Sequence, residues 1–226
     1  IQVPYHQFEE PLNIIDNYPN RLPKIWLYKM GCVTHVSTSS ELQIASNLSQ
    51  ARAKIFLETR YYIRDALSAL FNINPMKVPI TAHPGEPPEL PNGMGYISIS
   101  HCKDAFIIGW HRENIGIDIE RSDRDFNYQK LAKKYFQKEN IKNFNMNKYL
   151  ILKEWSAIEA AIKCDRGKLS RDIKEWQFRI NKENLYHKSK KIKLNLIQIP
   201  FLDWTISIAY KNKVLDELPK IICTKL

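Results

Sequence analysis

Two short stretches of the sequence place acidic and basic side chains at spacings that suit chemistry. In the first, Asp118 and Glu120 are two residues apart in an isoleucine-rich run that is typical of a β-strand. Side chains two apart in a strand project from the same face, so these carboxylates should lie side by side. In the second, Trp155–Lys163, strong helix formers place Glu159 and Lys163 four residues apart and therefore on one helix face.

Three carboxylates that converge on one point repel one another unless a cation joins them. Mg²⁺ prefers hard oxygen ligands and is usually held by a few carboxylates together with substrate phosphates. We therefore expect Asp118, Glu120 and Glu159 to be metal ligands, with Lys163 facing the same phosphates. This set indicates metal-assisted phosphoryl or phosphodiester transfer. A single acidic residue in a strand is, by contrast, more often exposed to solvent or paired in a salt bridge.

Charge and cysteine usage narrow the class of protein. The chain of 226 residues has a net charge of +10, which favours an acidic partner: nucleic acid, an anionic membrane surface, a polyphosphate ligand or an acidic protein. Its four cysteines are far apart and form no CxxC pair, which argues against a zinc site or a disulfide framework and fits a reducing cytosol. No signal peptide and no apolar run near the length of a membrane span are found, so a cytoplasmic location is expected.

Hydrophobic periodicity predicts an α+β chain. Helices are predicted at 41–69 with a break near 47–49, at 130–136 and at 149–163. Strands are predicted at 25–28, 96–101, 105–110, 114–120, 173–180, 191–199 and 204–210.

The connecting segments have their own composition. Residues 1–24 indicate an irregular arm, 74–91 a proline-rich connection and 138–148 a Lys- and Asn-rich segment, either a surface loop or a basic lip for an acidic protein. The sequences of 96–100 and 204–209 are weakly similar, which suggests two similar lobes of roughly 110 residues, a normal domain size.

The two chemical stretches also carry a resemblance. Gly-Ile-Asp-Ile-Glu, followed a few dozen residues later by Trp-Ser-x-x-Glu-Ala-x-x-Lys, resembles the 4′-phosphopantetheinyl transferases of the Sfp type. Those enzymes move the phosphopantetheine arm of coenzyme A onto a serine of a carrier protein and release 3′,5′-ADP. The resemblance covers roughly 26–210. It implies two lobes related by a pseudo-twofold axis, 1–112 and 113–226, each with helices on a small, mostly antiparallel sheet and with the active site at their seam.

The resemblance implies further site residues. A basic helix should contact the coenzyme A phosphates, and a Gly-x-Pro loop should border its adenine. A Ser-His pair should also contact the phosphates, and Glu159 and Lys163 should be catalytic, with Glu159 or a water molecule as the base. The implied coenzyme A ligands are Lys54, Arg60, Arg64, Gly85, Pro87, Ser100, His101, Asp118 and Lys163.

Each of these features has a plainer structural interpretation. Charges along a helix more often form a solvated face, Gly85–Pro88 can be a simple turn, and a histidine at a strand end is more often a structural hydrogen-bonding group. The sequence also departs from the family pattern, with Glu86 and Ile158 where the family has lysines and with Ser98 and Cys102 beside the Ser-His pair. Because neighbours on a helix do not face the same way, the change at Ile158 should remove an outer contact and leave the face of Glu159 intact.

The resemblance predicts a Mg²⁺-dependent transferase whose partners are coenzyme A and an apo acyl or peptidyl carrier protein, as used in fatty acid, polyketide or nonribosomal peptide synthesis. Two lobes in one chain predict a monomer, with neither nucleic acid nor membrane as partner. One alternative is a relative that binds coenzyme A or a carrier protein without catalysis. The other is a basic nucleic-acid-binding module, which would need aromatic and basic residues interleaved on a strand surface; the basic residues here are mainly on the 51–64 helix and in lysine-rich turns.

Overall fold

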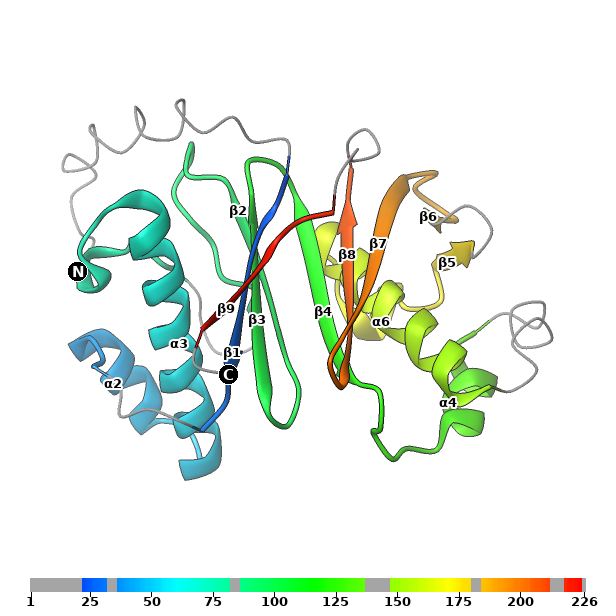
Figure 1. Cartoon of the computed structure of the whole chain (residues 1–226), viewed down its shortest axis with the longest axis horizontal. Helices are drawn as coiled ribbons and strands as arrows, with labels where there is room; N and C mark the ends of the chain where they lie inside the picture. The colour runs from blue at the N-terminus through cyan, green and yellow to red at the C-terminus, as the bar shows by residue number, and fades with distance from the viewer. Residues whose placement is uncertain are drawn as a thin grey trace.

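Two β-sheets form the centre of the molecule, and helices lie on their outer faces (Figure 1). This computed structural model describes residues 22–31, 36–81, 86–136, 147–179, 184–211 and 218–224. The first sheet has the strand order β2 (Tyr96–His101), β3 (Ala105–His111), β1 (Lys24–Lys29), β9 (Ile221–Thr224). The second has the order β4 (Ile115–Arg121), β8 (Trp204–Tyr210), β7 (Lys193–Phe201), β6 (Asn184–His187), β5 (Trp176–Arg179). Neighbouring strands are antiparallel except β1 and β9, which are parallel.

The first sheet is covered on both faces, which explains why its central strands are apolar throughout. Ile25 and Leu27 of β1 face the second sheet, where they join a core shared by both sheets. Trp26 and Tyr28 point the other way and pack with residues of α3 (Gln50–Phe71). A two-sided burial of this kind needs continuous apolar sequence instead of alternation.

The helices begin and end at recognisable signals. Thr38 caps α2 (Ser39–Ser46) through a capping box with Glu41, and the predicted break follows at 47–49 before α3 begins at Gln50. In the second half, Asn147 caps α6 (Lys148–Cys164). The short helices are η2 (Pro75–Lys77), α4 (Tyr128–Tyr135) and α7 (Leu169–Asp172).

Strand β4 and helix α6 pack directly against each other at Gly116. A Cβ atom on Gly116 would lie 1.8 Å from the carbonyl oxygen of Ala160, so only glycine permits this approach. Because residues two apart share a face, Asp118 and Glu120 are on the α6 side together with Gly116. The isoleucines of β4 point the other way, into the core between the sheets.

The sheets also meet along their edges, where β2 lies beside β4. The hydroxyl of Ser98 accepts a hydrogen bond from the backbone N–H of Ile117 (3.0 Å), and the hydroxyl of Ser100 donates to Asp118 Oδ1 (2.7 Å). Ser98 and Ser100 are two residues apart in β2, so both face β4. The edge of β4 is thus covered by side chains of the first sheet.

The α+β prediction is confirmed, and most predicted elements are present within one to three residues of their expected bounds. The strand predicted at 173–180 is wrong at its start: 173–175 form a turn after the helix α7, and β5 begins at Trp176. Strands β6 and β9 were not predicted, and β9 returns from the end of the chain to the first sheet. Most of the predicted arm (1–21) and of the Lys- and Asn-rich segment (138–146) lies outside the described residues.

No helix in the described ranges has the length and apolar character of a membrane span.

Candidate functional site

A pocket of about 970 Å³ lies where the two sheets meet. It is lined by the ends of β2 and β4, the β2–β3 turn, the loop after β4, and single residues of α3 and α6. Among the residues that the structure describes, six carboxylates and three cationic side chains line it, so this lining carries excess negative charge in a chain of net charge +10. The acidic residues are Asp104, Asp118, Glu120, Asp123, Asp125 and Glu159, and the cationic residues are Lys103, Arg121 and Arg124.

Asp118 is the most deeply buried of these carboxylates, with 2% of its surface exposed. Its Oδ1 atom accepts hydrogen bonds from the hydroxyl of Ser100 (2.7 Å) and from Lys163 Nζ (2.8 Å). Lys163 also donates to Ser100 Oγ (2.9 Å), so the three groups form a closed network. The Oδ2 atom of Asp118 is buried and accepts no hydrogen bond from the described residues. One oxygen is therefore held firmly, while the other has no hydrogen-bond partner among the described residues.

Glu120 and Glu159 complete the acidic group. Arg124 Nη1 donates to both carboxylate oxygens of Glu120, at 2.6 and 2.7 Å. Lys163 Nζ lies 3.8 Å from Glu159 Oε2. Burial, followed by the charge of Asp118, raises the pKa of Glu159 to about 8, although Lys163 opposes the rise. The pKa of Glu120 is also raised, first by burial and then by Asp118.

The chemistry of this donor set fits Mg²⁺, but the carboxylates are not arranged as a ready-made ligand set. Among the described residues, no group of three or more His, Cys, Asp or Glu side chains stands in metal-binding geometry. The predicted convergence on one point is therefore not found: three negative charges repel, and each carboxylate is turned toward Lys163 or Arg124 instead. The unpartnered Oδ2 of Asp118 and the surplus of acidic groups in the pocket are the two observations that favour a cation.

His101 also lines the pocket, at the end of β2. Desolvation lowers its pKa, and the nearby ammonium group of Lys163 lowers it further. At neutral pH the imidazole is therefore predominantly neutral, and it offers one hydrogen-bond donor and one acceptor.

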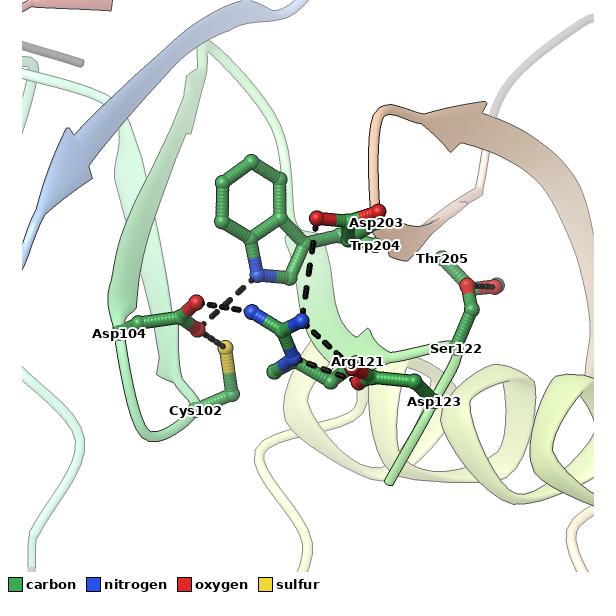
Figure 2. A network of polar contacts seen from close by, with 8 residues as sticks. All are labelled: Cys102, Asp104, Arg121, Ser122, Asp123, Asp203, Trp204 and Thr205. Atoms are coloured by element: carbon green, nitrogen blue, oxygen red, sulfur yellow. Dashed lines mark hydrogen bonds and ion pairs between the residues drawn. The ribbon is translucent and has the colours of Figure 1, made fainter.

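Arg121, the last residue of β4, joins the two halves at the rim of the pocket (Figure 2). Its guanidinium binds Asp104 of the β2–β3 turn and Asp123 of the loop after β4, and lies 3.7 Å from Asp203 in the β7–β8 turn. The indole of Trp204 donates to Asp104 as well (3.2 Å). The β2–β3 turn, which follows His101 directly, is thus fixed to the second sheet.

The basic residues predicted on α3 do not line this pocket. Arg64 is buried in an ion pair with Glu41 and donates to the backbone oxygen of Val36 (2.7 Å), so its guanidinium serves the packing of α2 on α3. Arg60 is buried beside them, and its guanidinium lies 4.9 Å from the centre of the Phe56 ring. Lys54 is exposed.

The predicted adenine loop is described only in part. Pro87 is exposed and absent from the pocket lining, while Gly85 lies outside the described residues. The backbone oxygen of Pro88 accepts a hydrogen bond from Arg166 Nη1 (3.3 Å), which ties this loop to the segment after α6.

The position of Ile158 differs from the expectation. It was expected to mark a lost outer contact, but its side chain is 1% exposed and belongs to the core between α6 and the second sheet. A lysine there would place its charge in an apolar core, so an isoleucine fits this packing. The face that carries Glu159 and Lys163 is unaffected, as expected.

Six charged residues of the pocket lining are not among the site residues predicted from the sequence: Lys103, Asp104, Arg121, Asp123, Arg124 and Asp125. Four of these six lie in the segment of alternating charge that follows the Gly-Ile-Asp-Ile-Glu run, Arg-Ser-Asp-Arg-Asp. That alternation directly after two adjacent strand carboxylates was the available signal.

No protein-family model matches the chain, and the comparison with curated proteins finds no match.

Proposed function

We propose that this chain is a Mg²⁺-dependent 4′-phosphopantetheinyl transferase that moves the phosphopantetheine arm of coenzyme A onto a serine of an apo carrier protein. The observation that carries the proposal is the meeting of two separate motifs at one pocket. Asp118 and Glu120 from β4 line it together with Glu159 from α6, and Lys163 binds Asp118.

The residues divide between cation and phosphate binding. Asp118, Glu120 and Glu159 would hold Mg²⁺, which when bound supplies positive charge to the pyrophosphate of coenzyme A and to the leaving 3′,5′-ADP. Lys163 and neutral His101 donate hydrogen bonds toward phosphate oxygens, and Lys54 adds a cation on the adjacent helix. Ser100 holds Asp118 through Oδ1.

Glu159 is the candidate proton acceptor for the serine hydroxyl of the carrier protein. Burial and the charge of Asp118 raise its pKa in the metal-free protein, whereas a bound cation would lower it, so a water molecule is the alternative base. The nucleophile is the serine of the carrier protein, so the site itself needs only charged groups and no nucleophile.

The finer expectations belong to the same proposal. They are two lobes related by a pseudo-twofold axis, a monomeric and cytoplasmic enzyme, and an acidic acyl or peptidyl carrier protein as partner. The division of strands between two sheets supports the first, apart from β9, which crosses back to the first sheet.

A relative without catalysis is the second candidate. It was motivated by Ile158, Glu86 and Ser98. The burial of Ile158 weakens it, because position 158 has no access to the pocket. Ser98 is occupied with Ile117 of β4, so it joins the strands regardless of activity.

The test is the intact mass of an apo carrier protein after incubation with this chain, coenzyme A and Mg²⁺. We expect a gain equal to one phosphopantetheine arm, and we expect EDTA or Glu159→Gln to abolish it. Leu169→Gln, an exposed position on α7, serves as control and should keep the activity. No gain with acyl and peptidyl carrier proteins, while coenzyme A still binds, would reject the enzyme in favour of the second candidate.

A further inference from the structure

Arg124 forms an ion pair with the carboxylate of Glu120. A single guanidinium nitrogen, Nη1, donates to both oxygens of Glu120 at 2.6 and 2.7 Å. The arginine side chain is 43% exposed and reaches the pocket from the loop after β4. Its guanidinium lies 5.4 Å from the centre of the Phe126 ring, which supports it from one side.

The buried acidic group explains why a cation is held there. Glu120 is 8% exposed and neighbours Asp118, and a buried carboxylate without a positive partner is strongly destabilising. Arg124 supplies the positive charge to Glu120, and Lys163 supplies it to Asp118 and Glu159. The two basic side chains therefore act as internal counter-ions of the three carboxylates.

A divalent cation and Arg124 would need the same two oxygens of Glu120. We propose that Arg124 is an exchangeable counter-ion: it releases Glu120 when a divalent cation binds, and its freed guanidinium then binds a phosphate group of the anionic co-substrate. For the identity of that co-substrate the proposal rests on the proposed function. The planar guanidinium suits phosphate oxygens, and the exposure of the side chain allows it to turn without rebuilding the core.

The exchange couples cation and phosphate binding. Without the cation, Arg124 is tied to Glu120 and the pocket presents excess negative charge to an incoming phosphate. With the cation, the carboxylates are neutralised and Arg124 becomes a phosphate ligand. Each ligand should then raise the affinity for the other by the same factor.

The test compares wild type with Arg124→Gln by titration calorimetry, first with Mn²⁺ alone and then with 3′,5′-ADP in the presence of saturating Mn²⁺. In the variant, we expect Mn²⁺ to bind roughly tenfold more tightly, because the internal competitor is gone, and 3′,5′-ADP to bind roughly tenfold more weakly. Arg171→Gln is the matched control: it removes an arginine from an ion pair with Asp172 outside the pocket lining, and both affinities should stay unchanged.

The opposite signs of the two changes are the decisive feature. An arginine that only stabilised the loop would weaken both ligands when replaced. That result, unchanged affinities, or a wild type that binds no Mn²⁺ would each overturn the exchange. Arg124→Lys should bring the Mn²⁺ affinity back toward wild type, since it restores the charge. Opposite changes without mass gain in any carrier protein would keep the exchange and reject the transferase, so the two proposals fail separately.

Discussion

The carboxyl group of Glu159 lies in an unfavourable place for a negative charge. It is largely desolvated, with 20% of its side chain exposed, and Asp118 and Glu120 are nearby, so its pKa is raised although Lys163 partly compensates. The fold tolerates this cost because all three carboxylates are fixed by β4 and α6. Groups whose pKa is strongly shifted by burial and by a specific neighbouring charge cluster at functional sites.

A stability profile against pH should show this repulsion directly. Without metal, the unfolded chain loses the Glu159 proton near pH 4.5, whereas the folded chain keeps it until about pH 8. The unfolded state therefore binds fewer protons in this window, and the contribution of Glu159 to the free energy of unfolding falls as pH rises from about 4.5 to about 8. Glu159→Gln should flatten this part of the profile and be more stable than wild type at pH 8.

Urea unfolding at several pH values in EDTA provides the measurement. Glu175→Gln is a suitable control: this residue is also acidic, but it lies outside the pocket lining and its pKa is lowered. An identical pH slope in wild type and Glu159→Gln would contradict the repulsion.

At the scale of elements, the site depends on the contact between β4 and α6. Gly116 allows the two backbones to touch, and this contact sets how far Asp118 and Glu120 are from Glu159. A Cβ atom would also lie 2.4 Å from the backbone nitrogen of Cys164, and backbone atoms cannot turn aside as side chains do.

Gly116→Ala should therefore lower the free energy of unfolding by about 3 kcal/mol or more, because α6 must move away from the sheet. Gly109→Ala is the matched control on β3. Its Cβ would meet side-chain atoms and no backbone, with Ile115 Cδ1 nearest at 3.2 Å and Ile117 atoms at 3.4 and 3.5 Å, so a cost below about 1 kcal/mol is expected. Chemical denaturation of both variants gives the comparison, and equal costs would show that the close approach at Gly116 is not limiting.

Elements that depend on local sequence patterns could be predicted, and contacts between distant elements could not. Strand β4, helix α6 and the β2–β3 hairpin follow local periodicity and turn residues. Their positions could therefore be predicted, and with them the carboxylates of β4 and α6 and the lysine of α6. The partner of Arg64 was not predictable, because it depends on how α2 packs on α3. Strand β9 has four residues and pairs with a strand some 200 positions away, a contact that no local pattern encodes.

For the whole molecule, the core between the sheets matters most. Ile25 and Leu27 of the first sheet pack in one cluster with Ile117 and Ile119 of the second. The polar contacts of Arg121 at the pocket rim join the same two parts (Figure 2). Neither sheet has a complete core without the other, although the sequence divides naturally near residue 112.

This shared core predicts a single unfolding transition for the full chain. If the halves were independent, calorimetry would show two transitions. Because both sheets lose the common core together, we expect one transition, coincident by far-UV and near-UV circular dichroism.

Removing residues 212–226 deletes β9, whose Ile221 packs at the edge of this core. Loss of this side chain together with the β1–β9 pairing costs about 2 kcal/mol or more, which lowers the melting temperature by roughly 4 °C or more in a chain of this size. The truncated chain should still unfold in one step, since its second sheet cannot remain folded after the first is lost. A residual transition at the original temperature would show that the second half is stable alone and that the pocket lies between two independent units.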